Sequence, residues 1–133
     1  KDKFTNLINS LQNFNCLLVW GSPEEKNICD YIKSKTKAKV LPLIDLNTLK
    51  ALISKSDLLI GNDTGPTHMA WALNTASITL FGNTPGYRNT YVTATNKILE
   101  SDSTVNPLKL NKNDFSISDI QEEIIVKLAL ELL

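Results

Sequence analysis

The chain has 133 residues, enough for one domain with its own apolar core. Its 14 basic side chains balance 14 acidic ones, so it lacks the excess positive charge of most nucleic-acid-binding proteins, and we expect no nucleic acid partner. No stretch approaches the roughly 18 apolar residues of a membrane-spanning helix, and no signal peptide pattern opens the chain. Cys16 and Cys29 are too few for a disulfide framework and should be buried free thiols.

The first third of the chain predicts two helices and a strand. Apolar residues recur at helical spacing from Phe4 to Leu11, which indicates an amphipathic helix. The continuous apolar run at 16–20 predicts a strand that is covered on both faces. Ser22 and Glu25 then have the spacing of a capping box around Pro23, so a helix should begin there. Its buried positions should be Ile28, Tyr31 and Ile32.

The middle of the chain continues the alternation of strands and helices. Val40-Leu41 predicts a short strand, and Asp45 should cap a helix whose inward positions are Leu46, Leu49, Leu52 and Ile53. The apolar residues at 57–61 predict the next buried strand. A helix should start at Pro66 and carry Met69, Ala70, Ala72 and Leu73.

The last third predicts a strand at 76–81, a turn-rich loop at 82–89 and short strands near 97–99 and near Phe115. Ser118 should cap a closing helix with a shared face made by Ile120, Ile124, Leu128 and Leu132. This alternation predicts an α/β fold, a Rossmann-like parallel sheet with helices on both faces. In such sheets, ligands bind beyond the carboxyl ends of the strands.

The segment Asn62-Asp63-Thr64-Gly65-Pro66-Thr67-His68 joins a predicted buried strand to a predicted helix. The first amides of a helix have no partner within it and lie at the positive end of its dipole, which suits phosphate. Pro66 has no N–H, so the backbone of Gly65 and Thr67 should supply the donors, with the Thr64 hydroxyl beside them. The alternative is a structural junction, because the chain lacks the glycine patterns of dinucleotide-binding and P-loop proteins.

The string Asp63-Thr-Gly-Pro-Thr-His-Met-Ala70 closely resembles the signature D-[ST]-G-[PL]-x-H-x-A of the lipopolysaccharide heptosyltransferases, glycosyltransferase family 9. Trp20-Gly-Ser-Pro-Glu-Glu25 is similar to the family's strand-end W-G-x-x-x-E. The helix at 46–57 and the loop Gly82-Asn-Thr-Pro85 also resemble family segments. The resemblance covers roughly residues 4 to 90. It implies that residues 1–133 are a single donor-binding domain, the C-terminal half of a GT-B glycosyltransferase.

The resemblance also implies roles for single residues. Glu25 should accept hydrogen bonds from the ribose hydroxyls of ADP, although it could instead serve only as a helix cap. Ile44 should flank the adenine, or else belong to the core. Thr64, Gly65 and Thr67 should hold the diphosphate. Asp63 and His68 should approach the phosphate–sugar region, with Asp63 facing sugar hydroxyls because its charge repels phosphate.

The function implied is transfer of heptose from ADP-heptose to the lipopolysaccharide or lipooligosaccharide inner core, with inversion. We expect no metal and no cofactor, because ADP-heptose is a substrate. The catalytic base should be an aspartate of an N-terminal acceptor domain outside this chain, so residues 1–133 alone should be inactive. We expect a cytoplasmic protein, at most peripheral to the inner membrane.

One departure from the family pattern, one loop residue of open role and two alternative functions remain. Asn83 replaces a proline of the family's loop, and Arg88 could contact phosphate, the acceptor or only solvent. The chain could instead be the donor domain of another GT-B enzyme that uses a UDP- or GDP-sugar, or a non-catalytic nucleotide-binding module. A dehydrogenase-type domain would need the glycine fingerprint that is absent here.

Overall fold

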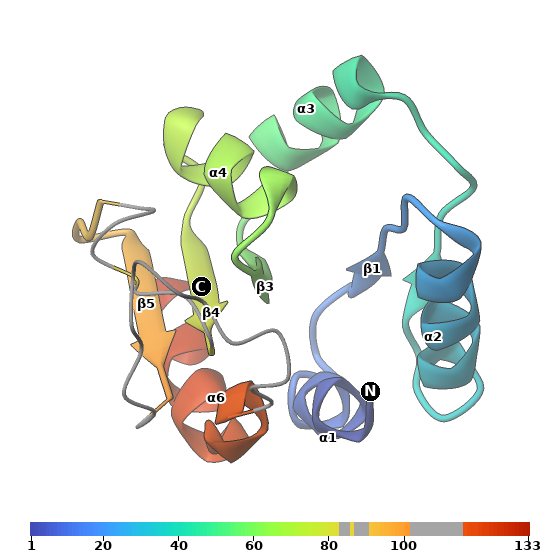
Figure 1. Ribbon diagram of the computed structural model, residues 1–133, viewed down its shortest axis with the longest axis horizontal. Helices are drawn as coiled ribbons and strands as arrows, with labels where there is room; N and C mark the ends of the chain where they lie inside the picture. The colour runs from blue at the N-terminus through green and yellow to red at the C-terminus, as the bar shows by residue number, and fades with distance from the viewer. Residues whose placement is uncertain (83–85, 87–90, 102–115) are drawn as a thin grey trace. The chain divides into compact units, whose positions relative to one another are not determined.

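Within residues 1–82, 86, 91–101 and 116–133, which this computed structural model describes, every strand pairs in parallel with its neighbour (Figure 1). The chain divides into two compact units, Lys1–Thr48 and Leu49–Leu133, and each is treated by itself below. The predicted α/β class with parallel strands is confirmed. No described helix is long and apolar enough to span a bilayer.

The first unit is a short parallel pair of strands with two helices. In chain order its elements are α1 (Asp2–Ser10), β1 (Leu17–Leu18), α2 (Pro23–Lys33) and β2 (Lys39–Val40). Leu17 lies opposite Lys39 in the pair. The core gathers where α1 and α2 meet β2, around the buried side chains of Ile8, Ile32 and Ala38. The amphipathic helices therefore build a small core, as their spacing predicts.

Two expectations about burial in this unit were wrong. Leu17 is 43% exposed, so β1 is not covered on both faces. Ile28 is 45% exposed, and Cys29 takes the buried position on α2 together with Ile32. Tandem apolar residues at 28 and 29 allow either register, and in the structure the thiol of Cys29 donates to the carbonyl of Val19 over 3.7 Å.

The second unit contains a three-stranded parallel sheet in the order β3-β4-β5. The helix α3 (Leu46–Ser54) spans the boundary between the units. The further elements are β3 (Leu59–Asn62), α4 (Gly65–Ala72), β4 (Ser77–Phe81), β5 (Asn96–Glu100), the 3₁₀ helix η1 (Ser116–Asp119) and α6 (Glu122–Leu132). The predicted strand near 97–99 is confirmed by β5.

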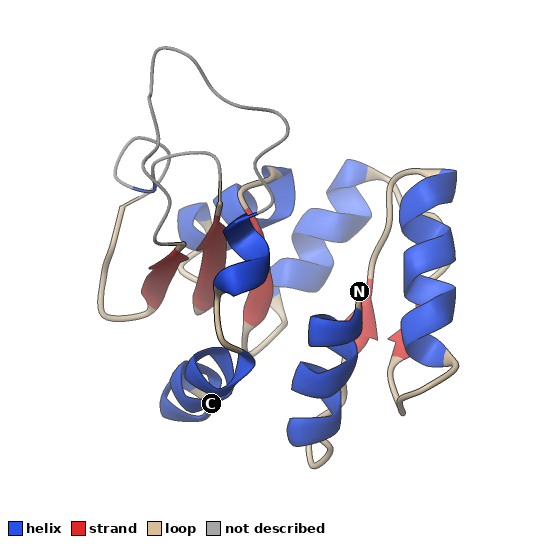
Figure 2. Ribbon diagram, turned by 60° about the horizontal axis from the view of Figure 1, so that its bottom comes forward, coloured by secondary structure: helices blue, strands red, loops and turns tan. Residues whose placement is uncertain are grey.

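The central strand β4 has both faces covered, because all five of its residues are buried. The helices α4 and α6 both contact it, and Figure 2 shows them on the two sides of the red strands. Side chains of a strand alternate between faces, so complete burial requires a layer on each side. The predicted arrangement with helices on both faces therefore holds in this unit.

The closing helix differs from the expectation. Ser118 lies within η1 and does not cap α6, whose N-cap is Gln121. Ile125 and Ala129 face the core, whereas Ile124 is 46% exposed. Leu46 of α3 is also exposed, at 70%, and Ile53 is the buried residue of that helix. The expected strand near Phe115 and the side chains of Asn83 and Arg88 lie outside the described residues.

Candidate functional site

The junction between β3 and α4 has the predicted strand–loop–helix form. The strand ends at Asn62, and Thr64 is the N-cap residue in an extended conformation. The amide of His68 donates to the carbonyl of Thr64 over 3.3 Å, so the amide of Gly65 precedes the hydrogen-bonded turn. The positive end of the α4 dipole therefore points out at the carboxyl edge of the sheet, where an anion is stabilised.

Asp63 and His68 face each other across this junction. The Nε2 of His68 lies 3.0 Å from Oδ1 of Asp63, and because an ionised carboxylate only accepts hydrogen bonds, the imidazole is the donor of this pair. The side chain of Asp63 is 14% exposed and that of His68 is 41% exposed. The imidazole therefore screens the carboxylate at the helix N-terminus, where an unscreened negative charge would repel phosphate.

Thr67 holds the loop together from inside. Its side chain is 1% exposed, and its Oγ1 lies 2.9 Å from the carbonyl of Asn62 and 2.7 Å from that of Thr64. The same oxygen accepts from the amide of Thr64 over 3.2 Å. The hydroxyl of Thr67 is thus consumed by the loop, and its backbone amide pairs with the side chain of Thr64 in a capping box.

The two glycines of the junction differ in their surroundings. A methyl group at Gly61 would lie 3.1 Å from Cγ2 of Thr67, so Gly61 is needed for close packing of strand against helix. A methyl group at Gly65 would meet nothing within 4 Å, and no glycine has a positive φ. Neither internal packing nor backbone strain explains a glycine at position 65. The open space beside it suits a ligand that approaches the backbone.

Glu25 lies at the start of α2 in the first unit. Ser22 is the N-cap, and its Oγ accepts from the amide of Glu25 over 3.3 Å. The Oε2 of Glu25 accepts from the amide of Gly21 over 2.7 Å, one residue before the N-cap. This confirms Ser22 as the N-cap, whereas the carboxylate of Glu25 bonds to Gly21 and not to the N-cap amide of a capping box. The bond to Gly21 fixes the direction of an exposed carboxylate. Gly21 is the one described donor to it, so its acceptor capacity is not exhausted.

Trp20 joins the ends of the two strands of this unit. Its indole Nε1–H donates to the carbonyl of Leu41 over 2.8 Å. The segment after Leu41 leads to Ile44, a half-buried residue of the loop before α3. The sequence alone gave no sign of this contact, because it joins residues far apart in the chain through a side chain.

The structure thus brings together Asp63, Thr64, Gly65, Thr67 and His68 at one junction of the second unit. Glu25 and Ile44 lie in the first unit, each in a segment that follows the carboxyl end of a strand. Both placements follow the rule for ligand sites in parallel sheets. The roles assigned to the seven residues stay predictions.

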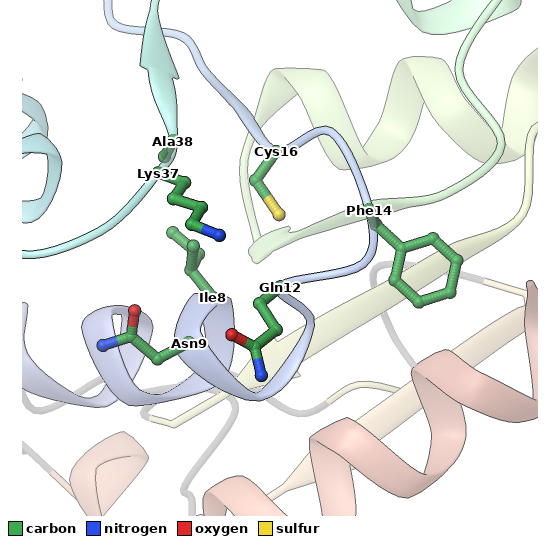
Figure 3. Close-up of a pocket in the computed structure, with 7 residues that line it drawn as sticks. All are labelled: Ile8, Asn9, Gln12, Phe14, Cys16, Lys37 and Ala38. Atoms are coloured by element: carbon green, nitrogen blue, oxygen red, sulfur yellow. The ribbon is translucent and has the colours of Figure 1, made fainter.

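A pocket of the first unit lies away from these residues (Figure 3). Its volume is about 40 Å³, and its lining comes from the end of α1 and from the segments before β1 and β2, as Figure 3 shows for Ile8, Gln12, Cys16 and Lys37. It opens at the amino ends of the strands, opposite Glu25. Its size suits water, and we assign it no ligand.

The two cysteines are free thiols, as predicted. Cys29 is buried and Cys16 is half-buried, and burial raises the pKa of both, so the unreactive protonated form is favoured. Among the described residues, no group of three or more His, Cys, Asp or Glu side chains could hold a metal ion.

The comparisons with known proteins agree on one family. Residues 1–116 match the family model of glycosyltransferase family 9 (heptosyltransferase). The chain is 39% identical over 132 residues to lipopolysaccharide heptosyltransferase 1 of Campylobacter coli, with 95% of this chain and 39% of that protein covered.

Two solved structures share the fold at lower sequence identity. E. coli heptosyltransferase WaaC with ADP aligns with a TM-score of 0.81 at 18% identity, over 99% of this chain and 39% of its own. A glycosyl transferase of family 9 from Veillonella parvula DSM 2008 aligns with a TM-score of 0.79 at 21% identity, over 98% and 40%. WaaC has also been solved with ADP-2-deoxy-2-fluoro heptose. The chain spans about 40% of the length of the proteins it matches.

Proposed function

The chain belongs to glycosyltransferase family 9, the heptosyltransferases, and on that premise we propose that it holds the sugar donor of an enzyme of lipopolysaccharide synthesis. The donor is ADP-heptose, and the acceptor is the inner core of lipopolysaccharide or lipooligosaccharide. The observation that carries this proposal is the β3–α4 junction, where a helix N-terminus, an open glycine and a screened Asp63–His68 pair occur together.

Each part of ADP-heptose has an assigned partner. The carboxylate of Glu25, directed by its bond to Gly21, accepts from the ribose hydroxyls, and Ile44 contacts the adenine. The N-terminus of α4, with Thr64, Gly65 and Thr67, holds the diphosphate. Asp63 accepts from sugar hydroxyls, and His68 lies between this carboxylate and the diphosphate.

The proposed reaction inverts the anomeric carbon. An acceptor hydroxyl attacks this carbon from the face opposite the diphosphate, while the bond between the carbon and the diphosphate oxygen breaks. The hydroxyl proton passes to a base that we place outside this chain. The electron pair of the broken bond leaves with ADP, and the α4 N-terminus stabilises the charge that develops there. This chain therefore contributes electrostatics to the reaction, and no proton transfer.

We propose no cofactor and no metal for this reaction. We place the enzyme in the cytoplasm. It is at most peripheral to the inner membrane, where it would reach a membrane-anchored acceptor. Residues 1–133 form the donor-binding domain in this proposal, and alone they transfer no heptose. Turnover by these residues without any other segment would contradict the assignment of the base.

Calorimetric titration with ADP, UDP and GDP tests the donor assignment. We expect binding that prefers ADP and that weakens roughly tenfold or more in Glu25→Ala, because a charged acceptor of hydrogen bonds is lost. Glu24→Ala is the matched control, since it removes the same charge from the neighbouring exposed position of α2. It should bind ADP as the wild type does.

The other outcomes separate the alternatives. Preference for UDP or GDP would assign the chain to a different sugar donor. A folded protein that binds none of the three nucleotides would contradict a donor site. Equal loss in Glu24→Ala and Glu25→Ala would show that general charge, and not a ribose contact, governs affinity. The anomeric configuration of the product, determined by NMR, tests inversion.

A further inference from the structure

We propose that Trp20 is a positioning residue for the nucleoside part of the donor, acting on Glu25 and on the loop of Ile44 through one hydrogen bond. The inference rests on the proposed function for the identity of the ligand. Its structural part, that Trp20 fixes the geometry of two loops, stands on contacts within the first unit alone.

The indole of Trp20 extends the pairing of β1 and β2 beyond the end of the backbone ladder. The amide of Leu41 donates to the carbonyl of Leu18 over 3.0 Å, which is the last backbone bond of this pair. The carbonyl of Leu41 then accepts from Nε1 of Trp20 over 2.8 Å. A side chain thus supplies the next link, at the carboxyl edge where the ladder is only two residues long.

Both proposed nucleoside contacts lie in segments that begin at the hydrogen bond between Trp20 and Leu41. On the β1 side, Trp20 is bonded to Gly21, whose amide holds the Oε2 of Glu25 at 2.7 Å. On the β2 side, Leu41 precedes the loop that contains Ile44. The spacing between the ribose acceptor and the adenine contact is therefore set by the indole hydrogen bond. Without it, a two-residue strand pair fixes neither segment firmly.

The ring of Trp20 also lies under the ammonium group of Lys26, 5.8 Å from its centre, on the first turns of α2. Trp20→Phe keeps an aromatic face for this cation but removes the N–H group. The substitution therefore tests the hydrogen bond with little change in packing. Trp71→Phe is the matched control, because the buried Nε1 of Trp71 has no hydrogen-bond partner in the described structure.

The experiment compares ADP with 2′-deoxy-ADP by calorimetry in the full chain. The wild type should prefer ADP, because Glu25 accepts from the ribose hydroxyls. Trp20→Phe should weaken ADP binding roughly twofold to tenfold and reduce this preference, as expected for one lost hydrogen bond. Trp71→Phe should keep the preference. A purely structural role of Trp20 would weaken both nucleotides by the same factor, and that result would overturn the proposal.

An NMR measurement separates this proposal from the assignment of the donor. In Trp20→Phe, the amide resonances of Gly21 and Ile44 should shift or broaden, while that of Gly65 in the other unit stays in place. These shifts without any ADP binding by the wild type would refute the proposed function and retain the structural role. Unchanged resonances of Gly21 and Ile44 would refute the role of Trp20, whatever the protein binds.

Discussion

The imidazole of His68 and the carboxylate of Asp63 lie 3.0 Å apart, on either side of the point where β3 gives way to α4. This pair places an acidic and a basic side chain beside the N-terminus of α4. When the imidazole is protonated, the pair as a whole is neutral. The local potential is then governed by the helix dipole, which favours a diphosphate.

We predict that Asp63 and His68 act on the donor as a pair, so that loss of either residue removes much of the contribution of both. Asp63→Asn and His68→Gln should each lower kcat/KM for ADP-heptose roughly tenfold to a hundredfold, because a charge-assisted hydrogen bond is lost. The double variant should lose less than the product of the two single losses, since both remove the same interaction. Steady-state kinetics of the four proteins, each assayed together with the segment that supplies the base, measures this coupling.

Asp57→Asn is the control for this cycle. It removes one negative charge from the same unit, at an exposed position before β3 and thus at the opposite edge of the sheet. Its kcat/KM should match that of the wild type. Independent, multiplicative effects of Asp63→Asn and His68→Gln would show that the 3.0 Å contact has no part in donor use.

The two glycines of the junction should respond differently to alanine. Gly65→Ala should leave the free energy of unfolding unchanged or raise it by up to about 1 kcal/mol, because the new methyl group meets nothing and alanine favours helix. The same variant should weaken ADP binding, since the methyl group occupies the space left for diphosphate. Denaturant unfolding and calorimetry measure the two effects.

Gly61→Ala provides the contrast. Its methyl group would lie 3.1 Å from Cγ2 of the buried Thr67, so the variant should be destabilised, by about 1–3 kcal/mol. A loss of stability in Gly65→Ala, or unaltered ADP affinity in that variant, would contradict the view that position 65 is open for a ligand.

Asp45 should make the stability of α3 depend on pH. Its Oδ1 accepts from the amide of Thr48 over 2.8 Å, and hydrogen bonds from Thr48 lower the pKa of this carboxyl below its ordinary value of 3.8. A depressed pKa in the folded state stabilises the fold above the unfolded-state pKa. This contribution is lost as the pH falls through the folded-state pKa.

Thermal unfolding of Asp45→Ala at a series of pH values tests this linkage. The difference in Tm between wild type and variant should be present at pH 7 and shrink as the pH falls below about 4. Asp45→Asn keeps a capping side chain without the charge, so its Tm should lack this part of the pH dependence. A Tm difference for Asp45→Ala that is the same at pH 7 and pH 2 would refute the prediction.

The positions of the strands and of most helix starts could be predicted because local chemistry determines them, whereas Ser118 indicated the wrong start for α6. An apolar run followed by Gly-Pro specified the β3–α4 junction, and Ser22-Pro23 specified the start of α2. The face of α6 could not be predicted, because apolar residues follow one another from Ile124 to Val126 and several registers give an apolar stripe. Packing against β4 selected Ile125 and Ala129.

The candidate site was predicted in part for the same reason. The proximity of Asp63 and His68 follows from their spacing across a helix start, and the capping role of Glu25 from its distance to Ser22. The burial of the Thr67 hydroxyl and the bond from Trp20 to Leu41 depend on how the backbone folds back. Contacts of this kind have no periodic signal in a sequence.

The complete burial of β4 has a consequence for how the protein opens. Ile78, Thr79 and Leu80 lie in the central strand, between β3 on one side and β5 on the other, and beneath two helices, so their amide hydrogens are well protected. They can exchange with solvent only when the unit unfolds as a whole, so their exchange rates report its global stability. The two-residue pair of β1 and β2, with Leu17 exposed, can open by local fluctuation. The protected strand β4 pairs with β3, whose end leads into the Asp63–His68 pair and the N-terminus of α4, whereas the fluctuating pair leads into the segments of Glu25 and Ile44.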